Sequence, residues 1–264
     1  MVAKLDKQKL QILNLISPFT SWILIRLFGG TGSWEEVFIE DSITTLLSPA
    51  AYTFAIWGPI FLLLGFFYLY QARDLLPGRE RIQMPFLQEV SIFFLLSTVM
   101  ATVWYLAWAS RWVWASVLAM IIYLFTILAA YFRLGINLRE RSRSERLYIT
   151  AGWSMYAGWV TVATLVNTTT GLAYTGFNNL PFTELQWTIA ASIAAVLIYL
   201  GFLFLREDYI FASVGVWSLI GLSITHYNPS PPSNLMVLYT SIAGAVIIAA
   251  AMVFRYIRRS QFTL

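Results

Sequence analysis

The sequence predicts an all-α membrane protein, a bundle of about eight transmembrane helices. Three observations lead to this fold class. Of the 264 residues, 59% are hydrophobic and only 11% are charged, whereas a soluble domain has roughly 25% charged residues. The apolar residues gather in runs near the ~20 residues with which a helix crosses a bilayer core. The basic residues fall in alternate connections between these runs, as the positive-inside rule requires.

Eight apolar segments follow one another along the chain. They lie approximately at residues 10–28, 48–70, 89–109, 112–132, 148–169, 185–205, 209–226 and 235–254. The first segment follows three lysines, as a signal peptide does. However, Asn14, Pro18 and Arg26 interrupt it and no A-x-A cleavage site follows, so we interpret it as an uncleaved helix.

The distribution of charge tests this count of helices. With eight crossings, fifteen of the 17 basic residues fall on the face that carries both termini. The opposite face keeps Arg111, and its first connection carries four acidic residues, Glu35, Glu36, Glu40 and Asp41. Short cytoplasmic loops are enriched in Lys and Arg, so both termini are predicted to be cytoplasmic. Membrane topology therefore explains the net charge of +4, and we expect no nucleic-acid partner.

The connections indicate which helices are neighbours. "ASRW" (109–112) and "RED" (206–208) leave almost no loop, so the third and fourth helices, and the sixth and seventh, are predicted to pack as antiparallel pairs. The long connections, 29–48 and 167–184, lie on the outer face. In the last helix, "SIAGAVIIAAAM" (241–252) is rich in small residues that allow helices to approach closely.

Aromatic residues make up 17% of the chain and include 11 tryptophans. Several tryptophans lie at an outer helix boundary, where Trp commonly anchors a helix at the membrane interface. Four others fall inside apolar segments, where each indole N–H needs a hydrogen-bond partner. These four are Trp57, Trp104, Trp153 and Trp159.

One segment carries polar and aromatic side chains on a single helical face. In "MYAGWVTVATLVN" (155–167), Tyr156, Trp159, Ala163 and Asn167 follow one another at spacings of three and four residues, which places them in one stripe. Two interpretations stay open. The stripe is the inward face of a helix bundle, or it is the wall of a pocket in which a flat ligand stacks on the rings.

Motifs in three segments point to a known family. The second segment, "SPAAYTFAIWGPIFLLLGFFYLY" (48–70), has a Pro, an aromatic residue and a Phe ahead of a Trp. The fifth has Tyr156, Trp159 and Asn167 at fixed spacing, and the third has Trp104 in "ATVWYLAW". With these residues the chain resembles the tryptophan-rich sensory proteins, the TspO and mitochondrial benzodiazepine receptor family, also called translocator proteins. The matching positions of the second segment are Pro49, Tyr52, Phe54, Trp57, Ile60, Phe61 and Gly65.

The chain also departs from the pattern of that family. The spacing from Phe54 to Trp57 is one residue shorter than usual, and Met155 replaces a Pro. Ala101 stands where Asn is common, and Phe61 lacks the hydroxyl of the family's Tyr. The resemblance covers roughly residues 8–169. It therefore predicts two parts, a five-helix TspO-like unit at 1–169 and three additional transmembrane helices with a basic tail at 170–264.

The resemblance implies a function and a site. It implies a bundle that binds porphyrins, haem-like tetrapyrroles or sterols under the long first loop, for sensing, transfer or photoprotection. No cofactor is required, and a porphyrin, haem or another hydrophobic pigment is the implied ligand. Arg26 is a further candidate, as the cationic partner of a ligand carboxylate, although snorkelling to lipid headgroups is the simpler interpretation. The candidate ligand-binding residues are Trp57, Phe61, Trp104, Tyr156, Trp159, Asn167 and Arg26.

Signatures of enzymes are missing from the sequence. There is no Gly-rich phosphate loop, no H-E-x-x-H motif, no cysteine and no cluster with metal-ligand spacing. The single histidine, His226, precedes a connection with three prolines, where we expect it to be solvated. We therefore expect neither an enzyme nor a metal site.

Two other functions stay open. The chain is a membrane carrier or permease, although helices without buried charges disfavour a proton-driven pump. Alternatively, it is a structural or assembly subunit of a larger, pigment-containing complex that docks through 241–252. The expected partners are the lipid bilayer, a hydrophobic small molecule, and a second copy of the chain or a larger membrane complex. The expected membrane is a bacterial plasma membrane or an internal photosynthetic membrane.

Overall fold

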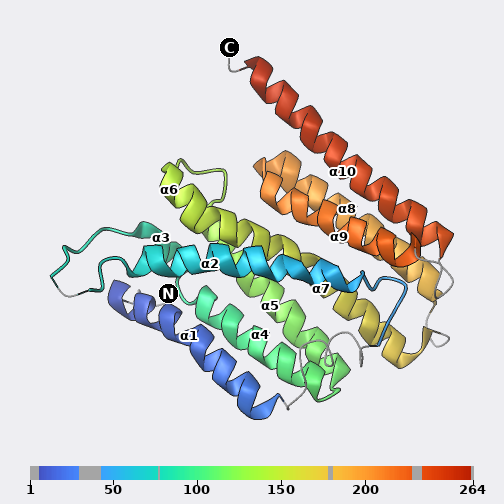
Figure 1. The fold of residues 1–264 in the computed structure, drawn as a ribbon, viewed down its shortest axis with the longest axis horizontal. Coiled ribbons are helices and arrows are strands. Elements are labelled where there is room, and N and C mark those ends of the chain that lie inside the picture. The colour runs from blue at the N-terminus through green and yellow to red at the C-terminus, as the bar shows by residue number, and fades with distance from the viewer. Residues whose placement is uncertain (1–5, 30–42, 77, 178–180, 228–233, 263–264) are drawn as a thin grey trace. The chain divides into compact units, whose positions relative to one another are not determined.

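The computed structural model describes residues 6–29, 43–76, 78–177, 181–227 and 234–262 (Figure 1). Every regular element within these residues is helical, which confirms the all-α prediction. In chain order the elements are α1 (Lys7–Phe28), η2 (Ala51–Ile56), α2 (Trp57–Ala72), α3 (Pro85–Val90), α4 (Phe93–Ala109), α5 (Val113–Leu134), α6 (Arg143–Glu145), η3 (Arg146–Thr150), α7 (Ala151–Thr175), α8 (Glu184–Arg206), α9 (Tyr209–Tyr227) and α10 (Leu235–Phe262).

Each of the eight predicted segments contains a helix, but the prediction of eight membrane spans is wrong. Among the described residues, six helices are long and apolar enough to cross a membrane, which marks the chain as an integral membrane protein. The six are Lys7–Phe28, Ala51–Ala72, Val113–Leu134, Glu184–Arg206, Tyr209–Tyr227 and Leu235–Arg258. The two segments that fall short correspond to α4 and α7.

These two helices fall short for different physical reasons. Ser91, with a φ of 51°, ends α3 and separates it from α4. This break leaves α4 with 17 residues, about 26 Å at ~1.5 Å per residue, whereas the bilayer core is ~30 Å thick. In contrast, α7 is long enough at 25 residues. Its threonines, glycines and Asn167 lower its apolar content.

The helices form two compact units. The first unit comprises Met1–Phe38 and Trp57–Ala157, and so contains α1 to α6, η3 and the beginning of α7. The second unit comprises Ile39–Ile56 and Gly158–Leu264, with η2, the rest of α7, and α8 to α10. Within these units α4 packs against α5, and α8 packs against α9. The two neighbour pairs predicted from short connections are therefore confirmed.

In the first unit, α1 turns a polar face towards its neighbours. Its buried residues include Gln11, Asn14 and Ser17, whereas apolar side chains such as Phe19 and Leu27 are exposed. The Asn14 Nδ2 donates to Gln71 Oε1 of α2 at 3.0 Å. A polar group in hydrocarbon must find its hydrogen bond within the protein. The polar face of α1 therefore packs inward and its apolar face is left for lipid.

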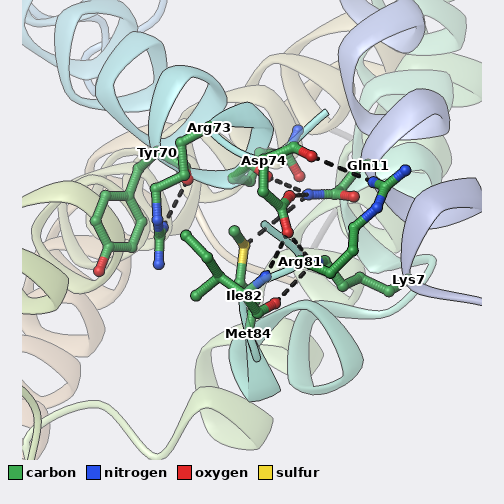
Figure 2. A network of polar contacts seen from close by, with 9 residues as sticks. Lys7, Gln11, Tyr70, Arg73, Asp74, Arg81, Ile82 and Met84 are labelled. Atoms are coloured by element: carbon green, nitrogen blue, oxygen red, sulfur yellow. Dashed lines mark hydrogen bonds and ion pairs between the residues drawn. The ribbon is translucent and has the colours of Figure 1, made fainter. Parts of the chain in front are cut away.

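Asp74, just beyond the end of α2, is the centre of a polar network that joins α1 to α2 (Figure 2). It is 1% exposed and forms an ion pair with Lys7. Its carboxylate also accepts hydrogen bonds from Gln11 Nε2 at 2.8 Å and from the Ile82 N–H at 2.9 Å. Burial by itself raises the pKa of the Asp74 carboxyl, but these donors outweigh it and lower the pKa to about 2.

In the second unit, residues 43–50 form a strap that is held on both sides. The Leu46 N–H donates to Glu184 Oε1 of α8 at 2.7 Å, and the Leu46 carbonyl lies 2.8 Å from His226 Nε2 of α9. Leu47 packs in an apolar cluster with Leu222 of α9 and Val237 of α10. The strap belongs to the long first connection, whose residues 30–42, including its four acidic residues, lie outside the described residues.

The position of His226 differs from the prediction. His226 lies in the last turn of α9 and is 5% exposed, so the expectation that it is solvated is wrong. Its Nε2 faces the Leu46 carbonyl, and its Nδ1 lies 3.4 Å from the Asn234 N–H. Through these contacts His226 connects the strap to the residue that precedes α10.

The close packing of α8 and α9 depends on a glycine. A Cβ at Gly215 of α9 would overlap the ring of Tyr199 of α8, and the Tyr199 hydroxyl donates to the Gly158 carbonyl of α7 at 2.9 Å. Small residues at such crossings let helices approach closely in membranes. Three helices therefore meet around Tyr199.

We expect Gly215→Ala to lower the free energy of unfolding by about 1–3 kcal/mol, because the added methyl group displaces a buried ring. Gly201→Ala is the matched control, since a Cβ there has no neighbour within 4 Å and Ala is the better helix former. Thermal unfolding in detergent, followed by tryptophan emission, measures both variants. Equal midpoints for the two variants would contradict this packing.

The Asp74 network predicts a dependence of stability on pH. The pKa of Asp74 in the folded protein, about 2, lies below its ordinary value of 3.8. The stability that the ionised Asp74 carboxylate contributes to the folded protein is therefore complete above pH 3.8 and is lost as the pH falls through 2. We expect Asp74→Asn to lower the unfolding midpoint at pH 7 and to reduce the loss of stability between pH 4 and pH 2. Glu140→Gln, at an exposed position, is the control and should change neither.

Candidate functional site

The stripe of aromatic and polar residues on α7 faces protein rather than lipid. From Ala151 to Thr161 every residue is buried except Met155, which is half-buried. Tyr156 and Trp159 are 6% and 3% exposed, and Asn167 is 5% exposed. The stripe is thus an inward face, as both interpretations of the sequence required.

The threonines on this helix find their partners within it. The Thr164 hydroxyl donates to the Val160 carbonyl at 2.7 Å, and Thr168 donates to the Thr164 carbonyl at 2.7 Å. Thr169 and Thr170 bond the carbonyls four residues back in the same way. Hydroxyls that bond the preceding turn need no other acceptor. These four threonines therefore give no indication of a ligand.

Trp57, the first residue of α2, forms an aromatic platform with the next turn of its helix. Its ring stacks on Phe61 with centroids 5.2 Å apart and an angle of 20° between the planes. Behind it, the ring of Tyr156 of α7 lies 6.2 Å away at 64°. Trp57 is half-buried, whereas Phe61 is 63% exposed. The platform is therefore fixed on its inner side and open on its outer side.

Tyr156 fixes the platform to the interior of the first unit. Its hydroxyl is hydrogen-bonded to the Tyr123 hydroxyl of α5. One turn earlier on α7, the ring of Trp153 lies 6.0 Å from Phe67 of α2 and 5.8 Å from Phe94 of α4. Four helices thus hold the rings behind Trp57. Because Tyr123 already binds the Tyr156 hydroxyl, the platform offers a ligand ring faces rather than hydroxyl groups.

The other predicted residues have different places. Trp104 is half-buried on α4, and Arg26 is exposed in the last turn of α1 near Tyr105. Trp159 and Asn167 belong to the second unit, where the Trp159 ring packs edge-to-face on Phe54 at 5.7 Å. Ring contacts thus join three of the predicted residues, Trp57, Phe61 and Tyr156.

Sequence reasoning missed Tyr123 as part of this site. Tyr123 is 2% exposed and holds Tyr156. The available signal was a lone hydroxyl in "MIIYLF" (120–125), because a phenol at the centre of an apolar helix needs a partner. In the part of the chain that the structure describes, no group of three His, Asp or Glu side chains could hold a metal ion.

The comparison with known families addresses the whole chain. The family model of TSPO-like proteins matches residues 11–254. No curated protein and no solved structure matches the chain. The resemblance read from the motifs ended near residue 169, whereas the family match continues through α8 and α9 and includes most of α10. Because the matched region covers far more than half of the chain, the chain belongs to the family of TSPO-like proteins.

Proposed function

We propose that this membrane protein binds a flat hydrophobic ligand of the tetrapyrrole or sterol class on the platform of Trp57 and Phe61, for sensing, transfer or photoprotection. The observation that carries the proposal is the stacked pair of rings, whose outer member Phe61 is 63% exposed. A ring that stacks on such a pair gains ~0.5–1.5 kcal/mol per aromatic contact beyond the burial of its area.

The geometry favours a planar conjugated ligand over a puckered one. Phe61 stacks on Trp57 within 20° of parallel, so the outer ring offers one flat face that the inner ring supports. Tyr156 and the rings around Trp153 hold Trp57 from behind. A platform that is already ordered loses little conformational entropy when it binds. A porphyrin satisfies these conditions better than a sterol does.

Two further points support this proposal. The chain belongs to the TSPO-like family, and the resemblance of its motifs to that family implies porphyrin or sterol binding. An even number of spans places both termini on one face, and the basic residues at the two ends of the chain, Lys7 and Lys9 and Arg255 and Arg258, support a cytoplasmic orientation for both. No acidic or basic side chain belongs to the platform itself, so we expect it to bind the ring face of a porphyrin rather than its carboxylates.

The test is a titration of the detergent-solubilised protein with protoporphyrin, followed by quenching of tryptophan emission. We expect saturable quenching, and Phe61→Ala should raise the dissociation constant roughly threefold to tenfold through the loss of one stacking contact. Trp57→Phe should weaken the quenching as well. Phe19→Ala, which removes a similarly exposed ring from α1, should leave the constant unchanged.

Micelles without protein give the background for partition of the porphyrin into detergent. Equal dissociation constants for Phe61→Ala, Phe19→Ala and the unchanged protein would show that the platform does not bind the ligand. Quenching that does not saturate would indicate partition alone, and the proposal would then fail.

A further inference from the structure

Three arginines gather around one glutamate at the end of the span Val113–Leu134. Arg139 and Arg141 both form ion pairs with Glu89 of α3. The third, Arg133 in the last turn of α5, donates from Nε to the Glu89 carbonyl at 2.7 Å and from Nη2 to the Gln88 carbonyl at 2.8 Å. We call Arg133, Arg139, Arg141 and Glu89 the arginine cluster.

The arginine cluster carries more positive than negative charge. Of the three guanidinium groups, two pair with the single carboxylate. The carbonyl partners of Arg133 hold its orientation without neutralising its charge. Arg141 is packed inside, with a side chain that is 8% exposed, and it also donates to the Leu134 carbonyl at 2.7 Å. The arginine cluster therefore has a fixed geometry and an excess of two formal positive charges.

The positive charge that Glu89 does not neutralise is accessible from outside the protein. The Arg139 side chain is 54% exposed, and Arg133 is also exposed. A guanidinium group has five N–H donors, and only some of those on Arg133 and Arg139 are used in the contacts described. Free N–H groups in a planar fork match the oxygens of a phosphate.

Apolar side chains mark the depth at which this charge lies. Phe132 and Leu138, which flank Arg133 and Arg139 along the chain, are 48% and 62% exposed. Phe132 lies in the last turn of the span Val113–Leu134, and Leu138 lies shortly beyond its end. Exposed apolar residues beside exposed arginines fit a boundary between acyl chains and headgroups. A soluble anion would meet the arginines but would leave these apolar side chains uncovered.

We propose that the arginine cluster is a binding site for the headgroup of an anionic phospholipid, with the lipid's acyl chains against Phe132 and Leu138. The phosphate lies on the exposed N–H groups of Arg133 and Arg139, while Glu89 and Arg141 hold the site in shape. This inference does not depend on the proposed ligand of the aromatic platform, because the two sites share no residue.

The test compares phosphatidylglycerol with phosphatidylcholine on the full-length protein. The protein is purified in detergent with an equal mixture of both lipids, and native mass spectrometry counts the lipids that stay bound. We expect phosphatidylglycerol to be retained preferentially. Arg133→Gln and Arg139→Gln should each reduce that preference about fivefold, the contribution of one basic side chain near an anionic surface.

The double variant Arg133→Gln, Arg139→Gln should lose more of the preference than either single variant. Its matched control is Arg79→Gln with Arg258→Gln, which removes two exposed arginines at other places and makes the same change in net charge. Equal retention of both lipids by the unchanged protein would overturn the proposal. An equal loss in the control would overturn it too, since net charge alone would then account for the binding.

A competition separates a lipid from a soluble phosphate. Glycerol phosphate in excess should displace little phosphatidylglycerol, because it cannot cover Phe132 and Leu138. Full displacement would show that the arginine cluster is a site for soluble phosphates, and the lipid proposal would fail. The lipid comparison and this competition both use the unchanged protein, so the proposal stays testable even if an arginine variant does not fold.

Discussion

The high cost of an unpaired polar group inside a membrane decides how the polar faces of these helices are oriented. Water is absent from the bilayer core, so a hydroxyl, amide or indole must find its partner within the protein. For this reason α1 buries Gln11 and Asn14 and exposes Phe19, the reverse of a helix in a soluble protein. The same rule pairs Tyr123 with Tyr156 and turns the threonines of α7 back onto their own helix.

This constraint also shapes the candidate site. A Tyr156 hydroxyl that is bound to Tyr123 cannot serve a ligand, and the ring of Tyr156 then acts as the support of Trp57. What remains open towards the outside is the apolar ring of Phe61, stacked on Trp57. Binding by shape and stacking, rather than by a charged or metal-centred contact, is the chemistry that such an arrangement can perform.

Much of the fold could be predicted because hydrophobic segments and short connections are local signals. The eight helical segments, the neighbour pairs and the burial of the α7 stripe follow from spacing and composition. The shortening of α4 could not be predicted, because the break at Ser91 comes from one backbone angle and not from a polar residue. The polar content of α7, by contrast, is visible in the sequence. His226 was misjudged because its partner Leu46 lies 180 residues away.

The site could be predicted only in part, for a similar reason. Trp57, Phe61 and Tyr156 stand out by motif, and ring contacts join them. Tyr123 and the arginine cluster depend on contacts between helices far apart in sequence, and neither has a spacing pattern of its own. Trp159 and Asn167 share a stripe with Tyr156 along α7, but they belong to the second unit.

The central claim is that a planar ligand is held in one fixed orientation on the platform of Trp57 and Phe61. Circular dichroism in the Soret region tests it most directly, because a porphyrin gains a signal there only when a chiral site fixes its orientation. For the purified protein with bound protoporphyrin, we expect an induced signal that disappears in empty micelles. A porphyrin that co-purifies with the protein but shows no induced signal would contradict the claim, since it would then be dissolved in the detergent rather than bound to the rings.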